Sequence, residues 1–176
     1  MPGIDASRPF IPLNIAIMTV SDTRMPETDT SGDVLEARLT AAGHKLAART
    51  IVSDDIQMIR NQLLAWIASD EIDIVISTGG TGLTGRDVTP EAFKSVYEKE
   101  IDGFSALFHA VSFAKIGTST IQSRATAGVA HGKYIFALPG SPGACKDGWD
   151  EILVHQLDSR FRPCNFVEIL PRLQER

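Results

Sequence analysis

One stretch near the middle of the chain constrains the fold more than any other. Residues 72–76 (IDIVI) have the composition of a buried strand, and the loop that follows carries glycine at positions 79, 80, 82 and 85. Glycine permits positive φ, which lets successive backbone N–H groups turn toward one point and bind an anion. Thr89, Pro90 and Glu91 then have the character of an N-cap, a first helical residue and an acidic first turn. A strand, a glycine-rich loop and a helix start together predict a phosphate site.

The loop matches neither GxxxxGK[ST] nor GxGxxG, the two standard nucleotide-binding patterns. A flexible turn without a ligand is therefore an open alternative. Asp87 argues against it, because this carboxylate lies two residues before Thr89 and is not needed as a cap. A carboxylate beside a phosphate is repelled unless a cation lies between them, which points to Mg²⁺, although solvation of the loop is a weaker explanation. Thr78, Thr81 and Thr84 add hydroxyl donors.

Composition limits the class of protein. With 176 residues and 43% hydrophobic content, the chain has the size and composition of one globular domain. A formal net charge of −5 and the lack of basic runs argue against nucleic acid as a partner. Neither a signal-peptide pattern nor an 18-residue apolar run is present, so we expect a cytoplasmic protein without a membrane segment. Cys145 and Cys164 form no metal-binding pattern and are expected to be reduced thiols.

The apolar pattern predicts a mostly parallel sheet. Residues 14–20 (NIAIMTV) form a nearly continuous apolar run, which is typical of a strand buried on both faces. Further strands are expected at 46–52 and 72–76. An antiparallel hairpin at the edge of the sheet is expected from residues 125–130 and 134–138, with a turn at His131 and Gly132. Residues 1–12 are expected to form an arm on the domain or on a neighbouring subunit, and residues 13–176 a single domain.

Helical periodicity fills the intervals between the strands. The predicted helices cover residues 31–42 (capped by Thr30 or Ser31), 56–67, 89–102, 104–115 and 144–161. In the fourth helix we expect Phe104, Leu107, Phe108 and Val111 to be buried. The hydroxyl-rich residues 118–124 are expected either to cover a crevice or to cap a helix.

Small, hydroxyl-bearing or acidic residues follow each strand of the predicted parallel sheet. They are Ser21 and Asp22, then Asp54, then Gly79, Gly80, Thr81 and Gly82, and finally Pro139, Gly140 and Ser141. Open α/β sheets bind ligands at the carboxyl ends of their strands, so these four junctions predict a crevice for a phosphorylated ligand. Taken alone, Asp54 is better explained as the N-cap of the next helix. The spacing does not identify the ligand.

Two motifs in this order carry a specific resemblance. They are Thr78-Gly79-Gly80-Thr81-Gly82 with Arg86-Asp87-Val88-Thr89-Pro90-Glu91, and Leu138-Pro139-Gly140-Ser141-Pro142. From about residue 13 to 162 the chain resembles the MogA/MoaB family of molybdenum cofactor biosynthesis proteins. Residues 29–32, 117–124 and 162–166 resemble its MoaB branch. The resemblance implies a three-layer α/β/α sandwich with a Rossmann-like sheet, assembled as a homotrimer or homohexamer.

The resemblance also implies an activity. Active members of the family use MgATP to adenylylate molybdopterin: the terminal phosphate of the pterin attacks the α-phosphorus of ATP, and pyrophosphate leaves. A separate molybdate-inserting protein then takes the product. The family's two key aspartates match Asp54 and Asp87, which we expect to be catalytic and to hold Mg²⁺. The resemblance implies that residues 79–82 hold phosphate and that residues 139–141 form the second binding loop, with Ser21 and Asp22 at the opening.

Two other functions stay open at this point. A non-catalytic paralogue would bind or hand on molybdopterin without ATP, and it would need neither Asp54 nor Asp87. Some MoaB-type members lack the second key aspartate, so the presence of Asp87 favours an enzyme. The third function is hydrolysis of a different nucleotide-like pyrophosphate, since function depends on the site and not on the fold.

Overall fold

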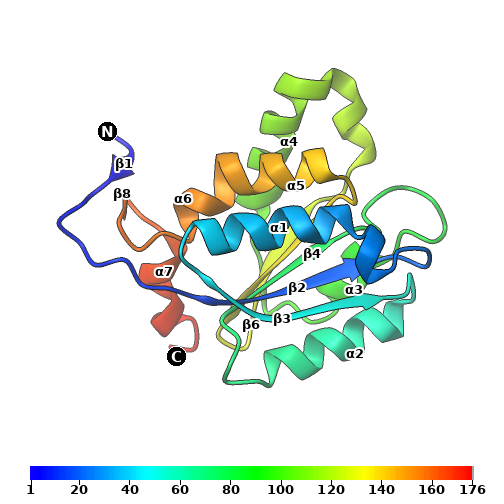
Figure 1. Cartoon of the computed structure of the whole chain (residues 1–176), viewed down its shortest axis with the longest axis horizontal. Helices are drawn as coiled ribbons and strands as arrows, with labels where there is room; N and C mark the ends of the chain where they lie inside the picture. The colour runs from blue at the N-terminus through cyan, green and yellow to red at the C-terminus, as the bar shows by residue number, and fades with distance from the viewer. Residues whose placement is uncertain (176) are drawn as a thin grey trace.

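The computed structural model describes residues 1–175 and has helices on both faces of a six-stranded sheet (Figure 1). Four neighbouring strands are parallel, β6 is antiparallel to the fourth, and the short β5 is antiparallel to β6. In spatial order the strands are β3 (Lys45–Val52), β2 (Asn14–Val20), β4 (Ile74–Thr78), β7 (Lys133–Leu138), β6 (Thr126–Ala130) and β5 (Lys99–Glu100). The predicted α/β fold in three layers is confirmed.

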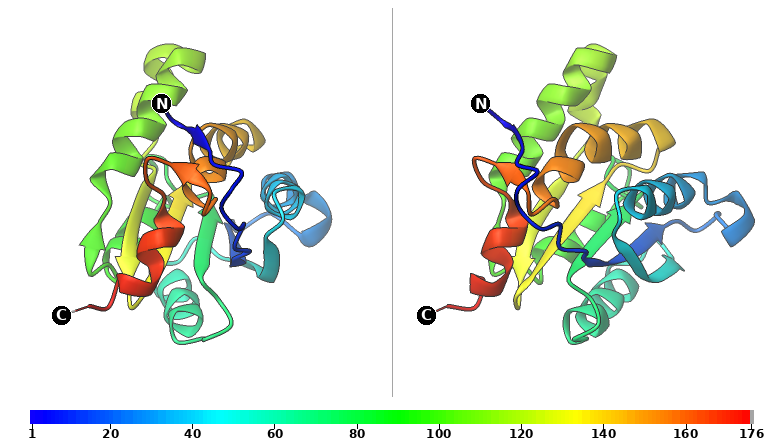
Figure 2. Two further views of the ribbon diagram at one scale, coloured as in Figure 1. Left: turned by 90° about the vertical axis from the view of Figure 1, so that its left-hand side faces the viewer. Right: turned by 60° about the vertical axis from the view of Figure 1, so that its left-hand side comes forward.

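Alternate side chains of the central strands enter two separate cores. In β2, Ile15 and Ile17 are buried on one face of the sheet, and Ala16 and Met18 on the other. Successive residues of a strand point to opposite faces, so an uninterrupted apolar strand needs a helical layer on each side. The layers consist of α1 (Thr30–Ala41), α4 (Asp102–Ile116) and α5 (Pro142–Gly148) on the first face, and α2 (Ile56–Ile67) and α3 (Thr89–Lys94) on the second. Both views in Figure 2 show α2 (teal) opposite α1 (cyan) and α5 (orange).

The predicted hairpin of β6 and β7 forms, but it lies one strand inside the sheet edge. His131 (φ 47°) and Gly132 (φ 81°) make its turn. The helix predicted over residues 89–102 is wrong beyond Lys94, because the chain leaves the helix there and β5 pairs with β6. The backbone N–H of Ile101 donates to the Ala127 carbonyl (2.8 Å), a bond between segments that helical periodicity does not register.

The helix predicted over residues 144–161 is shorter and less regular than expected. α5 continues into a π-helical turn (Trp149–Leu153) and then α6 (Val154–Gln156). The Asp158 carboxylate accepts from the Arg160 N–H (2.8 Å), a local bond that competes with helix continuation. Phe161 therefore lies in a strand and not in a helix.

The N-terminal arm lies against the C-terminal part of its own chain. β1 (Gly3–Ile4) pairs antiparallel with β8 (Phe161–Arg162). The Ile11 N–H donates to Ser159 Oγ (2.9 Å), which fixes the other end of the arm. The chain continues into α7 (Phe166–Ile169) and a 3₁₀ turn (Leu170–Arg172); two further 3₁₀ turns lie at Pro26–Thr28 and Gly117–Gln122.

Helix α4 forms where predicted, but one of its four expected core residues is exposed. Phe104 and Phe108 are buried and Val111 packs partly buried, whereas Leu107 is 49% exposed. Figure 1 shows α4 projecting beyond the helical layer formed by α1 and α5. Within residues 1–175, no helix combines the length and apolarity needed to cross a bilayer.

The two leucines Leu35 and Leu107 provide a matched test of this packing. Leu35 in α1 is fully buried, so Leu35→Ala is expected to lower the free energy of unfolding by about 2–5 kcal/mol. Leu107→Ala is expected to change it by less than about 0.5 kcal/mol. Urea unfolding followed by circular dichroism measures both, and equal losses would contradict the packing described for α4.

Candidate functional site

The loops that follow β2, β3, β4 and β7 meet at one edge of the sheet. The Ser21 N–H donates to the Val52 carbonyl (2.9 Å), and the Gly79 N–H donates to the Leu138 carbonyl (3.0 Å). A cavity of about 60 Å³ lies between three of the loops, lined among others by Ser21, Gly79 and Gly140. It shares Arg24 and Asp29 with a larger neighbouring cavity of about 550 Å³. The predicted convergence of strand ends therefore exists in the fold.

Close backbone contacts explain the glycines at the centre of this edge. Gly79 has φ 103° and Gly80 has φ 66°. A Cβ atom on Gly79 would lie 2.2 Å from the Val20 carbonyl oxygen, and one on Gly80 would lie 2.3 Å from Thr89 Oγ1. A Cβ atom on Gly140 would lie 3.0 Å from the Gly79 Cα. Only glycine satisfies both the conformation and the space at positions 79 and 80.

Asp54 and Asp22 bind each other's backbone across the β2 and β3 loops. The Asp22 N–H donates to Asp54 Oδ2 (3.0 Å), and the Asp54 N–H donates to Asp22 Oδ1 (3.1 Å). Asp22 also forms an ion pair with Arg86. The other oxygen of Asp54, Oδ1, is 3.2 Å from the position that a Cβ on Gly80 would occupy. This places the Asp54 carboxylate directly beside the glycine-rich loop.

Asp55, and not Asp54, is the N-cap of α2. Asp55 Oδ1 accepts from the N–H groups of Gln57 and Met58, both at 2.9 Å. The interpretation of Asp54 as a plain helix cap is therefore wrong, because its neighbour already makes both capping bonds.

Asp87 is held by its own loop. Its Oδ2 accepts from Thr84 N (2.9 Å) and from Thr84 Oγ1 (2.7 Å). The Thr78 hydroxyl donates to the Pro139 carbonyl (3.0 Å), and Thr81 is 2% exposed. The threonines expected to offer free hydroxyl donors are thus engaged or buried. Their role in the structure is to shape the loops.

Thr89 joins the start of α3 to the glycine-rich loop. The helix begins at Thr89 as predicted, but Val88 occupies the N-cap position without a side-chain capping bond. Thr89 Oγ1 donates instead to the Gly79 carbonyl (2.9 Å), and Thr89 N donates to the Gly80 carbonyl (3.0 Å). Thr89 therefore does not cap the helix as expected; it attaches the start of α3 to the glycine-rich loop.

The second loop, residues 139–141, is likewise ordered by local bonds. Ser141 caps α5, because its Oγ accepts from the Ala144 N–H (3.1 Å). The Pro139 carbonyl accepts from Thr78, and Gly140 packs on Gly79. Of the three predicted residues, Gly140 therefore makes the closest approach to the glycine-rich loop, and the side chain of Ser141 serves the helix.

The two key aspartates differ in their electrostatic environment. Burial raises the pKa of Asp54, and the charge of Asp87 raises it further. Burial acts in the same direction on Asp87, but hydrogen bonds from Thr84 and Gly82 outweigh it, so the pKa of Asp87 is lowered. A cation between the two carboxylates would relieve their repulsion.

This pair of carboxylates fits Mg²⁺. Magnesium is usually bound by one or two protein carboxylates, with water and substrate phosphate oxygens filling the other positions. In the described part of the chain, residues 1–175, no group of three or more His, Cys, Asp or Glu side chains is placed to hold a metal ion alone. A magnesium ion held by Asp54 and Asp87 would have its other coordination positions open to water and to phosphate oxygens.

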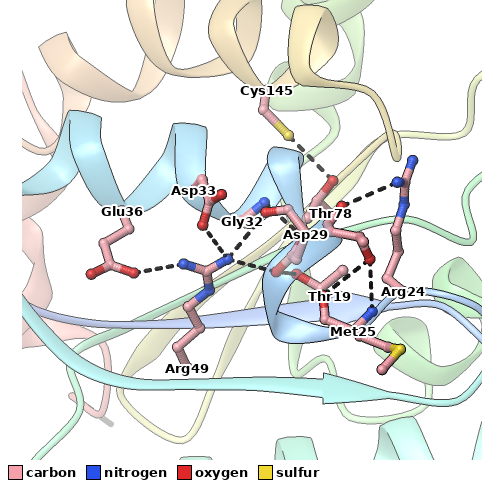
Figure 3. A network of polar contacts seen from close by, with 11 residues as sticks. Thr19, Arg24, Met25, Asp29, Gly32, Asp33, Glu36, Arg49, Thr78 and Cys145 are labelled. Carbon is pink, nitrogen blue, oxygen red and sulfur yellow. Dashed lines mark hydrogen bonds and ion pairs between the residues drawn. The ribbon is translucent and has the colours of Figure 1, made fainter.

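A buried ion pair beneath the site was not predicted from the sequence. Asp29 is 1% exposed and accepts from Thr19 Oγ1 (2.7 Å), Arg49 Nη2 (2.8 Å) and Gly32 N (3.0 Å) (Figure 3). Asp29, and not Thr30 or Ser31, therefore caps α1. Burial alone would raise the Asp29 pKa, but the bonds from Arg49 and Thr19 outweigh it and lower the pKa. The sequence feature that could have indicated this ion pair is Arg49, a charged residue within a predicted strand.

Arg124, which lies in the segment just before β6, contacts the glycine-rich loop. Its N–H donates to the Thr81 carbonyl (2.9 Å), its Nε to Gly82 (2.9 Å) and its Nη2 to Asp87 (2.8 Å). Its guanidinium also pairs with Glu91. The sequence drew attention to residues 118–124 only for their hydroxyls, and Arg124 at their end is the residue that contacts the site.

Comparison with known proteins identifies the family. Residues 16–159 match a family described as "Probable molybdopterin binding domain". Molybdenum cofactor biosynthesis protein B of Escherichia coli (strain K12) is 51% identical over 160 residues, which are 91% of this chain and 94% of that protein. The chain belongs to the MogA/MoaB family. The Bacillus cereus protein of the same name is 42% identical over 142 residues, covering 80% of this chain and 84% of that protein.

Solved structures of this MogA/MoaB family agree with the fold. A crystal structure of molybdenum cofactor biosynthesis protein B has a TM-score of 0.85 and 36% identity, covering 94% of this chain and 98% of that one. The tungsten cofactor synthesizing protein MoaB from Pyrococcus furiosus has a TM-score of 0.76 and 32% identity, with coverages of 93% and 98%. The resemblance inferred from the motifs is confirmed, and the protein is assigned to molybdenum cofactor biosynthesis.

Asp29 predicts a pH dependence of stability. Its pKa is below the ordinary value of 3.8 in the folded protein, so its contribution is complete above about pH 4 and is lost as pH falls through the folded pKa. Asp29→Asn is expected to lower the free energy of unfolding by about 1–3 kcal/mol at pH 7, and by less at pH 2–3. Asp33→Asn, at a 60% exposed side chain that also pairs with Arg49, should cost less than about 1 kcal/mol. A deficit of Asp29→Asn that is independent of pH would contradict the assigned ionisation.

Glycine substitutions test the backbone contacts of the site. Gly79→Ala is expected to lower the free energy of unfolding by at least about 1–3 kcal/mol, because both its φ and the Val20 carbonyl oppose a Cβ atom. Gly85→Ala is the matched control, since a Cβ there meets nothing within 4 Å. It should change stability by less than about 0.5 kcal/mol in the same thermal unfolding measurement. An equal response of the two variants would rule out the close contact.

Proposed function

We propose that the protein is a molybdopterin adenylyltransferase, which transfers AMP from MgATP to the terminal phosphate of molybdopterin and releases pyrophosphate. Its family membership supports the pterin as a ligand. The observation that carries the enzymatic assignment is the pair of carboxylates along the glycine-rich loop, with Asp54 beside Gly80 and Asp87 beside Gly82. The charge of Asp87 disfavours ionisation of Asp54, and a cation that joins the two carboxylates to a phosphate would offset this cost.

The loop geometry supports phosphate binding by backbone groups. Positive φ at Gly79 and Gly80 and the absence of side chains there leave the loop open to a close approach. The small cavity beside Gly79 has room for a compact polar group, and the larger one that shares Arg24 has room for more of a phosphorylated ligand. Arg24 is a cation suited to a phosphate at their junction.

In the proposed reaction, an oxygen of the pterin phosphate forms a bond to the α-phosphorus of ATP as the bond from that phosphorus to the bridging oxygen breaks. Pyrophosphate leaves with the bond's electron pair. Asp54 and Asp87 would hold Mg²⁺, which when bound neutralises phosphate charge. Backbone N–H groups of the glycine-rich loop orient the phosphates, and rigid strand ends keep these groups in place. The product would pass to a separate molybdate-inserting protein, and the chain would assemble as a homotrimer or homohexamer.

The second candidate is a non-catalytic molybdopterin carrier. One observation favours it: both Thr84 bonds to Asp87 stabilise the loop, which gives that carboxylate a structural use without any metal. Asp54 distinguishes the two functions. It caps no helix, and burial disfavours its ionised form. A carrier has no use for this negative charge, whereas the enzyme would use it to hold Mg²⁺.

Aspartate variants separate the two candidates. With molybdopterin and MgATP, the wild-type protein is expected to release pyrophosphate, and Asp54→Asn and Asp87→Asn are each expected to reduce kcat by about 100-fold or more. Asp70→Asn, at an exposed position on the opposite end of the sheet, is the control and should keep full activity. Asp54→Asn should retain the wild-type melting temperature, because it removes a charge that burial disfavours.

Three results would contradict the enzyme. Pterin binding without pyrophosphate release, unchanged in both variants, would identify a carrier. Turnover of ATP or of ADP-ribose that does not require the pterin would identify a pyrophosphate hydrolase. Wild-type activity in both variants would remove the two carboxylates from the mechanism.

A further inference from the structure

We propose that Arg124 is a positioning residue for adenylyl transfer, which closes the turn from Gly82 to Asp87 and thereby fixes the Asp87 carboxylate. The inference rests on the proposed function and adds to it a residue that lies 37 positions from Asp87 in the sequence. Arg124 does not bind the phosphates in this proposal, because its side-chain donors already bond to protein groups.

The first argument is the geometry of the guanidinium. Nε donates to the Gly82 carbonyl at 2.9 Å and Nη2 donates to the Asp87 carbonyl at 2.8 Å. One planar group therefore bridges the two ends of the turn. The remaining nitrogen pairs with Glu91 in α3, and the Arg124 N–H holds the Thr81 carbonyl. Lysine carries its donors on a single nitrogen and lacks the planar fork, so it does not reproduce the Nε and Nη2 bonds to the two carbonyls together with the Glu91 pair.

The second argument is that the turn has little other support. Residues 83–86 are exposed, and Leu83 is 68% exposed. The other long-range fastening within the turn is the ion pair of Arg86 with Asp22, in which the Arg86 side chain is 72% exposed. Exposed ion pairs contribute little to rigidity. Gly82 and Gly85 add backbone freedom, so a turn without Arg124 would sample many conformations.

The third argument links the turn to the chemistry. Asp87 is bonded to Thr84, which lies inside the same turn, so the carboxylate moves wherever the turn moves. Asp54 belongs to a different loop, fastened to Asp22. The separation of the two carboxylates therefore depends on how firmly the turn is attached to the body of the domain. A displacement of about 1 Å in a catalytic group costs up to about 100-fold in rate.

The experiment compares Arg124→Lys and Arg124→Ala with Arg172→Lys. Arg172 is the control. Its guanidinium likewise makes two hydrogen bonds, here both to Glu175 (2.9 and 3.0 Å), but at an exposed position away from the site. Pyrophosphate release with molybdopterin and MgATP gives kcat, KM and the Mg²⁺ concentration for half-maximal rate. Amide hydrogen exchange of residues 82–87, measured by mass spectrometry, reports the turn directly.

We expect Arg124→Lys to lower kcat by about 10- to 100-fold, with KM for molybdopterin within about twofold of wild type. The half-maximal Mg²⁺ concentration should rise, and exchange across residues 82–87 should accelerate. Added guanidinium should restore part of the Arg124→Ala activity, which a variant damaged only in folding would not show. Arg172→Lys should match the wild type in every measurement.

Unchanged amide exchange of residues 82–87 in Arg124→Lys would contradict the proposal that Arg124 closes this turn. Faster exchange with unchanged kcat and Mg²⁺ dependence would overturn the positioning role and leave a structural one. If the wild type itself releases no pyrophosphate, the proposed function is refuted. Slow amide exchange of residues 82–87 in the same protein would show that the turn is nevertheless intact. If both Arg124 variants melt at a much lower temperature than wild type and guanidinium restores neither folding nor rate, Arg124 is a folding residue and the proposal fails.

Discussion

The structure depends on one close approach of backbone to backbone. The Gly79 backbone lies against the Val20 carbonyl and against Gly140, so the loops after β2, β4 and β7 touch without intervening side chains. Parallel strands spaced in a sheet bring their carboxyl ends to a common edge. Two buried cores, one on each face, keep these strands in register. That contact sets how closely these three loops approach one another, and separate bonds then place the carboxylates, from Asp22 for Asp54 and from Thr84 for Asp87.

Much of this arrangement could be predicted from local sequence. The nearly continuous apolar run at residues 14–20 indicated a strand covered on both faces, and the small and acidic residues after the strands indicated the candidate site. The helix ends at Lys94 and Gln156 could not be predicted, because they are set by pairing with β6 and by the turn at Asp158. Asp29 with Arg49 lies 20 residues apart, and Arg124 lies 42 from Gly82, so periodicity contains no trace of either contact. Likewise, which of two adjacent aspartates caps α2 was decided by geometry alone.

Two buried or half-buried aspartates illustrate opposite uses of charge in the same domain. Asp29 is surrounded by donors, so ionisation stabilises the fold and fastens α1 to the sheet. Asp54 has one backbone donor and a neighbouring negative charge, so its ionisation is disfavoured. A fold under selection for stability alone would neutralise the second carboxylate. Under the proposed function the ligand brings the missing cation, so stability and function would diverge at Asp54 and not at Asp29.

The pairing of Gly3 with Arg162 has a consequence for the order of events on the ribosome. Gly3 and Ile4 cannot reach their final place until Phe161 and Arg162 have left the exit tunnel. β2 and β3 lie close in sequence and can pair long before that, so the central sheet precedes the arm that leads into it. Residues 3–4 can therefore be fixed only after residues 161–162 have been made, although they precede every strand of the central sheet in the sequence.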